Sequence, residues 1–348
     1  MQKKLSKKDF KKFFGALKKK HKIFAPTKKG TITAYNFGTF DYIDDVKWLN
    51  LDRNPISSPK KLFMPDGEAL FKFEKIGNDV VLEDTEQEWK EKRVLLGVRP
   101  CDIAAMAKFD KVFNEAYDDP YYRERRTNTL IIGMTCNEKT DDLCFCSVTE
   151  SGPDSDSGYD LLMTDIGSNY FFKSGSKEGE RWLEESYFKD VSKRDVQARD
   201  RKIADAKTDL DLEKNKLDLT NIKEAMAKAY DNKLWDPYGK RCVSCGSCNM
   251  VCPTCHCFTI LDKANVGQTE GKRVRIWDAC HFEKFAKMAG GFDIRPDKLS
   301  RLKHRLYDKF YYPFITYGEG FCVGCGRCIR HCQSEIDIRD ALREVAHE

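Results

Sequence analysis

Eight cysteines near the C-terminus have the spacing that binds iron–sulfur clusters. They fall in two runs, residues 242–252 and 322–332, and each run has the pattern Cys-x2-Cys-x2-Cys-x3-Cys. Bacterial-type ferredoxins use this pattern to hold 4Fe–4S cubanes, because a tight turn presents successive thiolates to one compact cluster. Gly246, Gly324 and Gly326 supply the backbone freedom that such turns need. The two runs predict two 4Fe–4S clusters that exchange electrons.

The order of the cysteines also predicts how the clusters share their ligands. The fourth cysteine of a run usually ligates the other cluster, because the chain is by then leaving the first one. The expected ligand sets are Cys242, Cys245, Cys248 and Cys332 for one cluster, and Cys322, Cys325, Cys328 and Cys252 for the other. A structural zinc site is the alternative. Zinc sites, however, pair two short Cys-x2-Cys knuckles to reach four ligands, and do not use two complete four-cysteine runs.

A second group of cysteines follows an α/β pattern. Residues 93–98 and 129–134 are short apolar runs typical of buried strands, and a cysteine follows each of them closely. If these strands are parallel neighbours, both thiols lie at the sheet edge where open α/β sheets place ligand sites. The next loop adds two more thiols. The four are either a third Fe–S site or unconnected buried thiols, since their spacing matches no ferredoxin run: Cys101, Cys136, Cys144 and Cys146.

The helix expected after the first of these strands bears on the reactivity of Cys101. Residues 103–113 have helical periodicity, and Asp102 is a natural N-cap. Cys101 would then lie at a helix N-terminus, which lowers the pKa of a thiol and favours the thiolate that a metal requires.

Three further cysteines, Cys255, Cys257 and Cys280, lie close in sequence to the first run. They are alternative ligands, or thiols that hydrogen-bond to the first cluster. A histidine adjoins a cysteine at three places, and it either tunes a cluster through a hydrogen bond or is simply exposed. These histidines are His256, His281 and His331.

Composition narrows the class of protein. The chain has 348 residues, 15 of them cysteine, and a net charge of +5. We find no secretory signal, and the cysteines are grouped at metal-ligand spacing, which indicates reduced thiolates in an anaerobic cytoplasm rather than disulfides. The longest apolar runs are too short to span a bilayer. We therefore expect a soluble cytoplasmic protein with no membrane span.

The Lys-rich N-terminus admits two readings. Binding of nucleic acid is one, but no RNA- or DNA-binding motif accompanies the lysines. The other is an amphipathic helix over residues 1–24, capped by Ser6, with a solvated face or a face that docks on an acidic partner subunit. Its apolar stripe is Leu5, Phe10, Phe13, Phe14 and Leu17.

The remaining pattern gives an α+β fold, in which an N-terminal α/β domain precedes a C-terminal α-helical ferredoxin domain. Further strands are expected over residues 31–37, 70–73, 159–163 and 169–173, long surface helices over 177–232, and helices over 282–288 and 299–310. The predicted divisions are a basic helix (1–30), an α/β domain (31–176), a charged helical bridge (177–238) and the ferredoxin domain (239–348).

Familiar catalytic motifs are absent from the sequence. No dinucleotide-binding G-x-G-x-x-G follows an expected strand, and there is no phosphate-binding loop, G-x-S-x-G elbow or HExxH. We therefore predict no catalytic residue, and flavin, hydride or substrate chemistry would come from another subunit.

Several motifs together resemble a known family. They are Gly97-Val-Arg-Pro-Cys-Asp102, Cys144-Phe-Cys146, the stretch from Cys242 to Cys257, Trp277-Asp-Ala-Cys280, Met288-Ala-Gly-Gly291 and the stretch from Phe321 to Cys328. In this order they are similar to the iron–sulfur electron-transfer subunit of anaerobic sulfite reductase and the β subunit of cytoplasmic sulfhydrogenases. Gln333 departs from the usual Cys-Pro ending of the second run.

The resemblance implies an electron-transfer subunit of an anaerobic oxidoreductase complex. Its partners would be a flavin- and 2Fe–2S-bearing subunit that reacts with NAD(P)H and a separate catalytic subunit of the sulfite reductase, NiFe hydrogenase or heterodisulfide reductase kind. The resemblance also strengthens Cys101, Cys136, Cys144 and Cys146 as a functional group, without saying what they bind. A self-contained Fe–S enzyme that acts on a sulfur substrate near Cys101 and Cys136 is the alternative.

Overall fold

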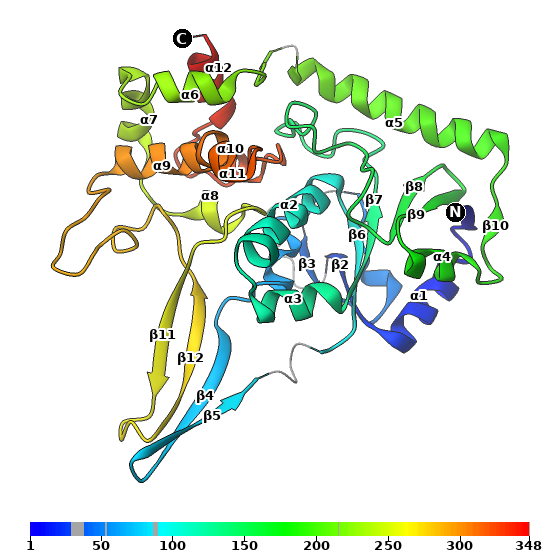
Figure 1. Cartoon of the computed structure of the whole chain (residues 1–348). Helices are drawn as coiled ribbons and strands as arrows, with labels where there is room; N and C mark the ends of the chain where they lie inside the picture. Colours follow the sequence, from blue (N-terminus) through cyan, green and yellow to red (C-terminus); the bar gives the residue numbers. More distant parts are fainter. Residues whose placement is uncertain (29–37, 53, 86–89, 215, 348) are drawn as a thin grey trace.

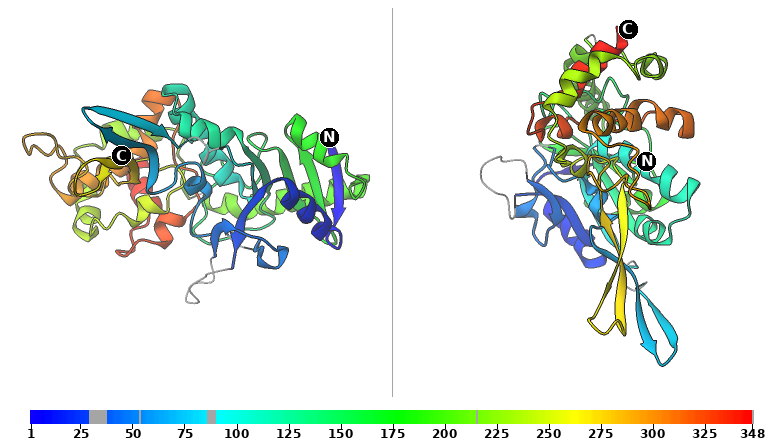
Figure 2. Two further views of the ribbon diagram at one scale, coloured as in Figure 1. Left: turned by 90° about the horizontal axis from the view of Figure 1, so that it is seen from below. Right: turned by 90° about the vertical axis from the view of Figure 1, so that its left-hand side faces the viewer.

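The computed structural model describes residues 1–28, 38–52, 54–85, 90–214 and 216–347. Figures 1 and 2 show three parts: a mixed sheet with helices on its faces, a helical region that contains the C-terminus, and a long β arm that projects from the body. The predicted strand over residues 31–37 lies outside the described residues.

The larger sheet has eight strands in the order β10-β1-β9-β8-β7-β6-β2-β3. Its centre is parallel, from β8 through β7 and β6 to β2, and the outer pairings are antiparallel. The strands are β1 (Gln2–Ser6), β2 (Lys22–Thr27), β3 (Thr39–Tyr42), β6 (Arg93–Val98), β7 (Thr129–Met134), β8 (Leu161–Asp165), β9 (Asn169–Ser174) and β10 (Lys189–Asp190).

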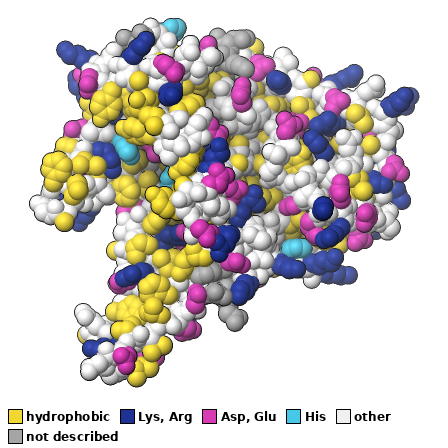
Figure 3. Space-filling view, viewed as in Figure 1, with side chains coloured by type: hydrophobic (Ala, Val, Ile, Leu, Met, Phe, Trp, Pro, Cys, Tyr) yellow, Lys and Arg dark blue, Asp and Glu magenta, His cyan; other side chains and the backbone are white. Residues whose placement is uncertain are grey.

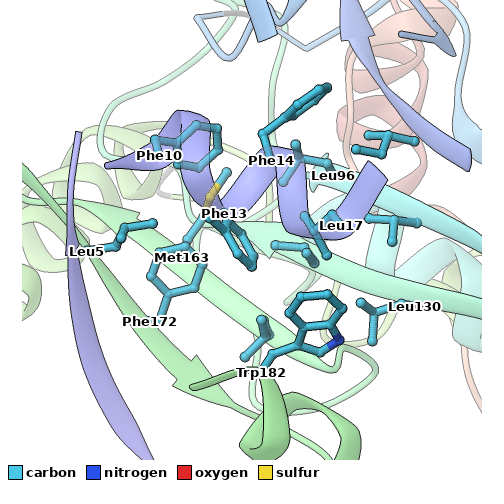
Figure 4. Close-up of a cluster of buried hydrophobic side chains, with 14 of the residues drawn as sticks. Leu5, Phe10, Phe13, Phe14, Leu17, Leu96, Leu130, Met163, Phe172 and Trp182 are labelled. Carbon is cyan, nitrogen blue, oxygen red and sulfur yellow. The ribbon is translucent and has the colours of Figure 1, made fainter. Parts of the chain in front are cut away.

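The N-terminal segment belongs to this sheet, and the prediction of one helix over residues 1–24 is wrong at both ends. Residues 2–6 form β1, which pairs with β9, and α1 (Phe10–Lys20) begins after Asp9 and ends before β2. Ser6 caps no helix. The predicted apolar stripe is buried in the sheet's core, where it meets Met163, Phe172 and Trp182 (Figure 4). The stripe is therefore used to fold this region, and the segment 1–30 is not a separate unit.

The strand–helix–strand unit of the sequence prediction is confirmed. β6 and β7 are adjacent, parallel and almost entirely buried, with Leu95 opposite Ile131. Asp102, however, is not the N-cap of the intervening helix. Because proline suits the first helical turn, α2 (Pro100–Asp110) starts earlier, at Pro100, and Arg99 precedes it. A π-helical turn (Lys111–Ala116) and α3 (Pro120–Thr127) complete the connection.

The β arm corrects the prediction of a helical insert between the two cysteine runs. It is a four-stranded antiparallel sheet in the order β11-β12-β4-β5. The strands are β4 (Glu68–Ile76), which confirms the strand expected at 70–73, β5 (Asp79–Asp84), β11 (Phe258–Ala264) and β12 (Glu270–Trp277). Residues 282–288 form turns, not a helix. The alternating, β-branched residues of 258–276 favour strands, and the apolar face of this hairpin is visible along the arm in Figure 3.

A buried charge cluster holds the base of the arm to the body. Glu68 of β4 accepts hydrogen bonds from Arg275 of β12, whose Nε lies 2.8 Å away, and pairs with Arg125 of α3. Arg275 also pairs with Asp119. Each of the two arginines therefore has a buried carboxylate partner, and the cluster joins three distant segments of sequence.

The C-terminal region is mainly helical and has its own apolar core around Trp235, Tyr307 and Leu342. Its helices are α6 (Ile222–Lys228), α7 (Asp236–Arg241), α8 (Ser247–Met250), α9 (Lys298–Phe310), α10 (Tyr312–Tyr317), α11 (Arg327–Arg330) and α12 (Ile338–Ala346). The helix expected over 299–310 is confirmed as α9. In the charged stretch before this region, α4 (Lys177–Leu183) and the long surface helix α5 (Lys193–Lys214) bear out the expected helices, and α5 runs from the large sheet toward the helical region (Figure 1). The division points near residues 176 and 238 stay a prediction.

Candidate iron–sulfur centres

The two cysteine runs fold alike. In each run the third cysteine follows a left-handed glycine that begins a one-turn helix, Gly246 before α8 and Gly326 before α11, both at φ 74°. L residues with a Cβ rarely adopt this conformation, so glycine is required there. α8 packs against α11, which sets the two runs side by side. The tight turns also aim backbone amides at sulfur: Ser244 N lies 3.4 Å from Cys242 Sγ, and Gly324 N lies 3.4 Å from Cys322 Sγ.

Two cavities lie between the runs, and the cysteines divide between them across the runs. Three cysteines of the first run line the first cavity together with Cys332 of the second run. Three cysteines of the second run line the second cavity together with Cys252 of the first run. The members are Cys242, Cys245, Cys248 and Cys332 for the first cavity, and Cys322, Cys325, Cys328 and Cys252 for the second, with Cys328 also reaching the first.

Two buried cations of α9 line the cavities. Arg305 of α9 lines both, is 4% exposed, and donates to Cys248 O at 2.9 Å and to Cys255 Sγ at 3.3 Å. Lys309, one turn later, lines the second cavity and donates to Thr254 O at 3.3 Å. A buried cation needs a compensating negative charge: Asp308 pairs with Lys309 at 3.0 Å, and metal-bound thiolates would add negative charge beside both cations. Neither Arg305 nor Lys309 was predicted, because nothing in the local sequence of this basic helix indicates that these two side chains face a buried site.

Burial governs the protonation of the cavity thiols. It raises the pKa of Cys248 and Cys325, and raises that of Cys328 well above the usual value. Cys252 is the exception: a hydrogen bond from Cys255, against the effect of burial and with help from Lys309 and Arg305, holds the pKa of Cys252 well below its usual value. The thiols whose pKa is raised therefore become thiolates only when a metal replaces their protons.

The structure also brings three cysteines of the third group into contact, and the fourth, Cys136, lies near enough to act electrostatically on Cys144 and Cys146. Cys101 lies in the first turn of α2, Cys136 just beyond β7, and Cys144 and Cys146 in the loop that follows; all four are buried. Cys101, Cys144 and Cys146 share one cluster of side chains with Val323, and Cys325 packs against it. Burial, followed by the charge of Asp102, raises the pKa of Cys101 well above its usual value. The expected lowering by a helix N-terminus is therefore wrong, because desolvation outweighs it.

This third group adjoins the second cavity directly. Phe145, between the two loop cysteines, lines that cavity, and its amide donates to Gly324 O at 2.8 Å. A Cβ on Gly324 would lie 2.5 Å from Phe145 O, so the two loops approach as closely as backbones allow. Arg327, next to Cys328, makes a bidentate pair with Asp102, next to Cys101, at 2.6 and 2.8 Å. No pattern in the sequence predicted this buried pair.

The three remaining cysteines line neither cavity, but they lie nearby. Asn249 Nδ2 lies 3.8 Å from Cys255 Sγ and 3.1 Å from Cys280 Sγ, and Cys257 hydrogen-bonds with Cys280. Lys60, 5% exposed, donates to Cys255 O at 3.1 Å. These thiols form a polar layer beside the cavities.

The three histidines next to cysteines have different surroundings. His256 packs among aromatic rings, with Phe113 at a centroid distance of 6.0 Å. His331 is partly exposed, whereas His281 is buried and lines the first cavity. In the described part of the chain no three His, Cys, Asp or Glu side chains converge closely enough to hold a single metal ion, and no helix is long and apolar enough to cross a bilayer.

Comparison with known proteins agrees with this geometry. The family described as 4Fe-4S dicluster domain matches residues 241–336, which contain both runs. Sulfhydrogenase 2 subunit beta of Pyrococcus furiosus is 34% identical over 346 residues, which cover 98% of this chain and 97% of that protein. No solved structure matches. The fold is thus a mixed α/β protein with a C-terminal 4Fe–4S dicluster domain, and the predicted resemblance is confirmed: the chain belongs to the family of sulfhydrogenase beta subunits.

Proposed function

We propose that this protein is an electron-transfer subunit that holds one 4Fe–4S cluster in each of the two cavities. The observation that carries the proposal is the division of the cysteines, because three from one run and the fourth from the other line each cavity. This is the ligand sharing of two-cluster ferredoxins. When bound, each cluster takes up and releases one electron.

The chain's own groups suit such clusters. The amides of Ser244 and Gly324, and that of Ile336 at 3.2 Å from Cys332 Sγ, donate toward ligand sulfur atoms. Arg305 lies between the cavities, where its charge acts on both. Donors and cations stabilise the more negative, reduced state, which raises a cluster's reduction potential.

A third cluster on Cys101, Cys136, Cys144 and Cys146 is part of the proposal. The contact of Phe145 with Gly324 and the pairing of Asp102 with Arg327 support a direct electron path from this group into the second cavity. The path would then continue to the first cavity, whose wall includes the exposed Cys245 and Val243. The proposed conduit thus has one buried end and one end at the surface.

We infer the partner subunits from the similar sulfhydrogenase subunit. Its name describes one subunit of a sulfhydrogenase, and we propose that this chain likewise works in a complex. The partners would be a flavin- and 2Fe–2S-bearing subunit that reacts with NAD(P)H and a catalytic subunit of the NiFe hydrogenase, sulfite reductase or heterodisulfide reductase kind. The surface at Cys245 and Val243 is where we place one of these contacts.

The alternative of a self-contained enzyme at Cys101 and Cys136 has less support. Both thiols are buried, at 6% and 9% exposure, and burial raises the pKa of each. A substrate would meet a protonated, covered thiol there. Turnover of a sulfur substrate by the isolated chain with a reduced dye would favour the enzyme instead.

The test uses protein purified anaerobically. We expect roughly eight iron atoms per chain from the two cavities, or about twelve with the third cluster. Cys245→Ser and Cys332→Ser, from different runs, should perturb the same cluster in EPR spectra, and Cys325→Ser and Cys252→Ser should perturb the other. Zinc in place of iron would refute the proposal, and so would spectra that pair the variants by run.

A further inference from the structure

A buried histidine in the wall of the first cavity has an unsatisfied hydrogen-bonding atom. His281 is 1% exposed and lines the cavity beside the cysteines of the first run. Its Nε2 has no hydrogen-bond partner among the residues that the structure describes. A buried polar atom left without a partner destabilises the fold, so such atoms are rare unless a ligand completes them. The occupant of the cavity is the group in position to do so.

The neighbour of His281 at Nδ1 does not decide which ring nitrogen carries the hydrogen. Nδ1 lies 3.9 Å from Cys280 Sγ. The thiol hydrogen of Cys280 goes to Cys257, a hydrogen bond that raises the pKa of Cys280 and lowers that of Cys257. The cluster proposed for the cavity selects the tautomer instead: its sulfur atoms only accept hydrogen bonds, so a neutral imidazole that bonds to one of them carries its hydrogen on Nε2. Nε2 is therefore a donor.

The charge state agrees with this tautomer. Burial, together with Arg305 and Arg301, lowers the pKa of His281 to about 3. The ring is neutral at physiological pH, with one donor and one acceptor nitrogen.

We propose that His281 donates its Nε2 hydrogen to a sulfur atom of the 4Fe–4S cluster in the first cavity and raises the reduction potential of that cluster. The inference rests on the proposed function, which puts a cluster in this cavity. The described residues that line the second cavity include no histidine, so the effect is confined to the first cluster.

The physical reason is the charge of the reduced cluster. Reduction adds one electron to sulfur-rich groups, and a fixed donor stabilises the added charge; hydrogen bonds to the sulfurs are among the main determinants of cluster potential. His281 is also a residue that the proposed electron path otherwise leaves without a role.

The experiment is an EPR-monitored redox titration of the full-length, anaerobically purified protein. His281→Phe removes the donor and keeps a ring. We expect the reduction potential of the first cluster to fall. At a fixed solution potential its reduced-to-oxidised ratio should then drop about tenfold, which corresponds to 59 mV for one electron. His281→Gln retains an N–H donor and should restore part of the shift.

A matched variant separates this role from packing. His331→Phe is the control, because His331 also adjoins a cysteine but does not line either cavity. The first cluster is identified as the signal that Cys245→Ser removes.

A second measurement needs no variant. With 15N-labelled histidine, pulsed EPR of the reduced wild-type protein should show a nitrogen hyperfine coupling to the first cluster. Absence of this coupling, or an unchanged potential in His281→Phe with both clusters loaded, overturns the inference and leaves the proposed function intact. Absence of a cluster that depends on Cys245 overturns the proposed function itself.

Discussion

The two cavities and the third cysteine group are both built from cysteine thiols, but their surroundings differ. In the cavities, thiols on glycine-containing turns surround space between two short helices. In the third group, Cys101 at the start of α2 and the two loop thiols are packed into a cluster with apolar side chains. The difference lies in how the chain brings ligands together. A run of nearby cysteines shapes its own cavity, whereas dispersed cysteines depend on the parallel sheet to meet.

The two kinds of site are nevertheless mechanically joined. The loop of Cys144 and Cys146 contacts the second run through Phe145 and Gly324, and Asp102 pairs with Arg327 across the same boundary. The α/β region and the ferredoxin region are therefore in direct contact beside the second cavity. Four predictions test how far the comparison holds, and they begin with the largest effect.

Alanine at Cys101, Cys136, Cys144 or Cys146 should each remove about four iron atoms per chain, because a shared cluster fails when any ligand is lost. Both ferredoxin signals should persist. Iron analysis and EPR on all four variants make the measurement, with Cys257→Ala as a control at a thiol outside the three sets. Unchanged iron in every variant would reduce the third group to packing, and only stability would then differ among the four.

Breaking the pair between Asp102 and Arg327 should destabilise the protein by about 3–5 kcal/mol, because the remaining partner is a buried, unpaired charge. Arg327→Met is the variant, and Arg330→Met, at the more exposed end of the same one-turn helix, is the control, with an expected loss below about 1 kcal/mol. Apparent melting temperatures at one scan rate measure the difference. Equal losses in the two variants would mean that the boundary is not held by this pair.

Gly326→Ala should cost more than Gly290→Ala, although both glycines have positive φ. Each substitution forces alanine into the left-handed region, at roughly 1–2 kcal/mol. Only at Gly326 would the new Cβ meet backbone, 2.6 Å from Leu143 O, while the space at Gly290 is open. The crowding adds about 1–3 kcal/mol, which melting temperature and iron retention report. Equal behaviour would show that the cysteine loop yields easily.

The smallest effect is expected far from every cysteine. Lys4 of β1 pairs with Asp195 of α5 at 2.8 Å, and both side chains are partly exposed. Lys4→Met should change stability by about 0.2–1 kcal/mol and leave iron content unchanged. A larger loss, or loss of iron, would mean that α5 transmits stability between the sheet and the helical region.

How well the sequence predicts a feature of this molecule depends on how far apart along the chain the interacting residues lie. The spacing of the two runs and the apolar strands 93–98 and 129–134 are local patterns, and the structure has the elements that they predict. The burial of Phe13 against Phe172, and the pairing of Asp102 with Arg327, arise only when distant segments meet. The expected N-terminal helix is too long because residues 2–6 pair with β9 as strand β1 instead. The periodicity within residues 1–24 gives no information on this distant partner.

The arm has a consequence for how the protein is made. Glu68 and Arg275 are 207 residues apart, so the hairpin β4–β5 leaves the ribosome long before its partner hairpin exists. At roughly 5–20 residues per second, the delay is on the order of 10–40 s. A two-stranded hairpin alone is only marginally stable in water, and β4 lacks its second neighbour, β12, during that time. The arm can therefore be completed only after the first cysteine run has been synthesised.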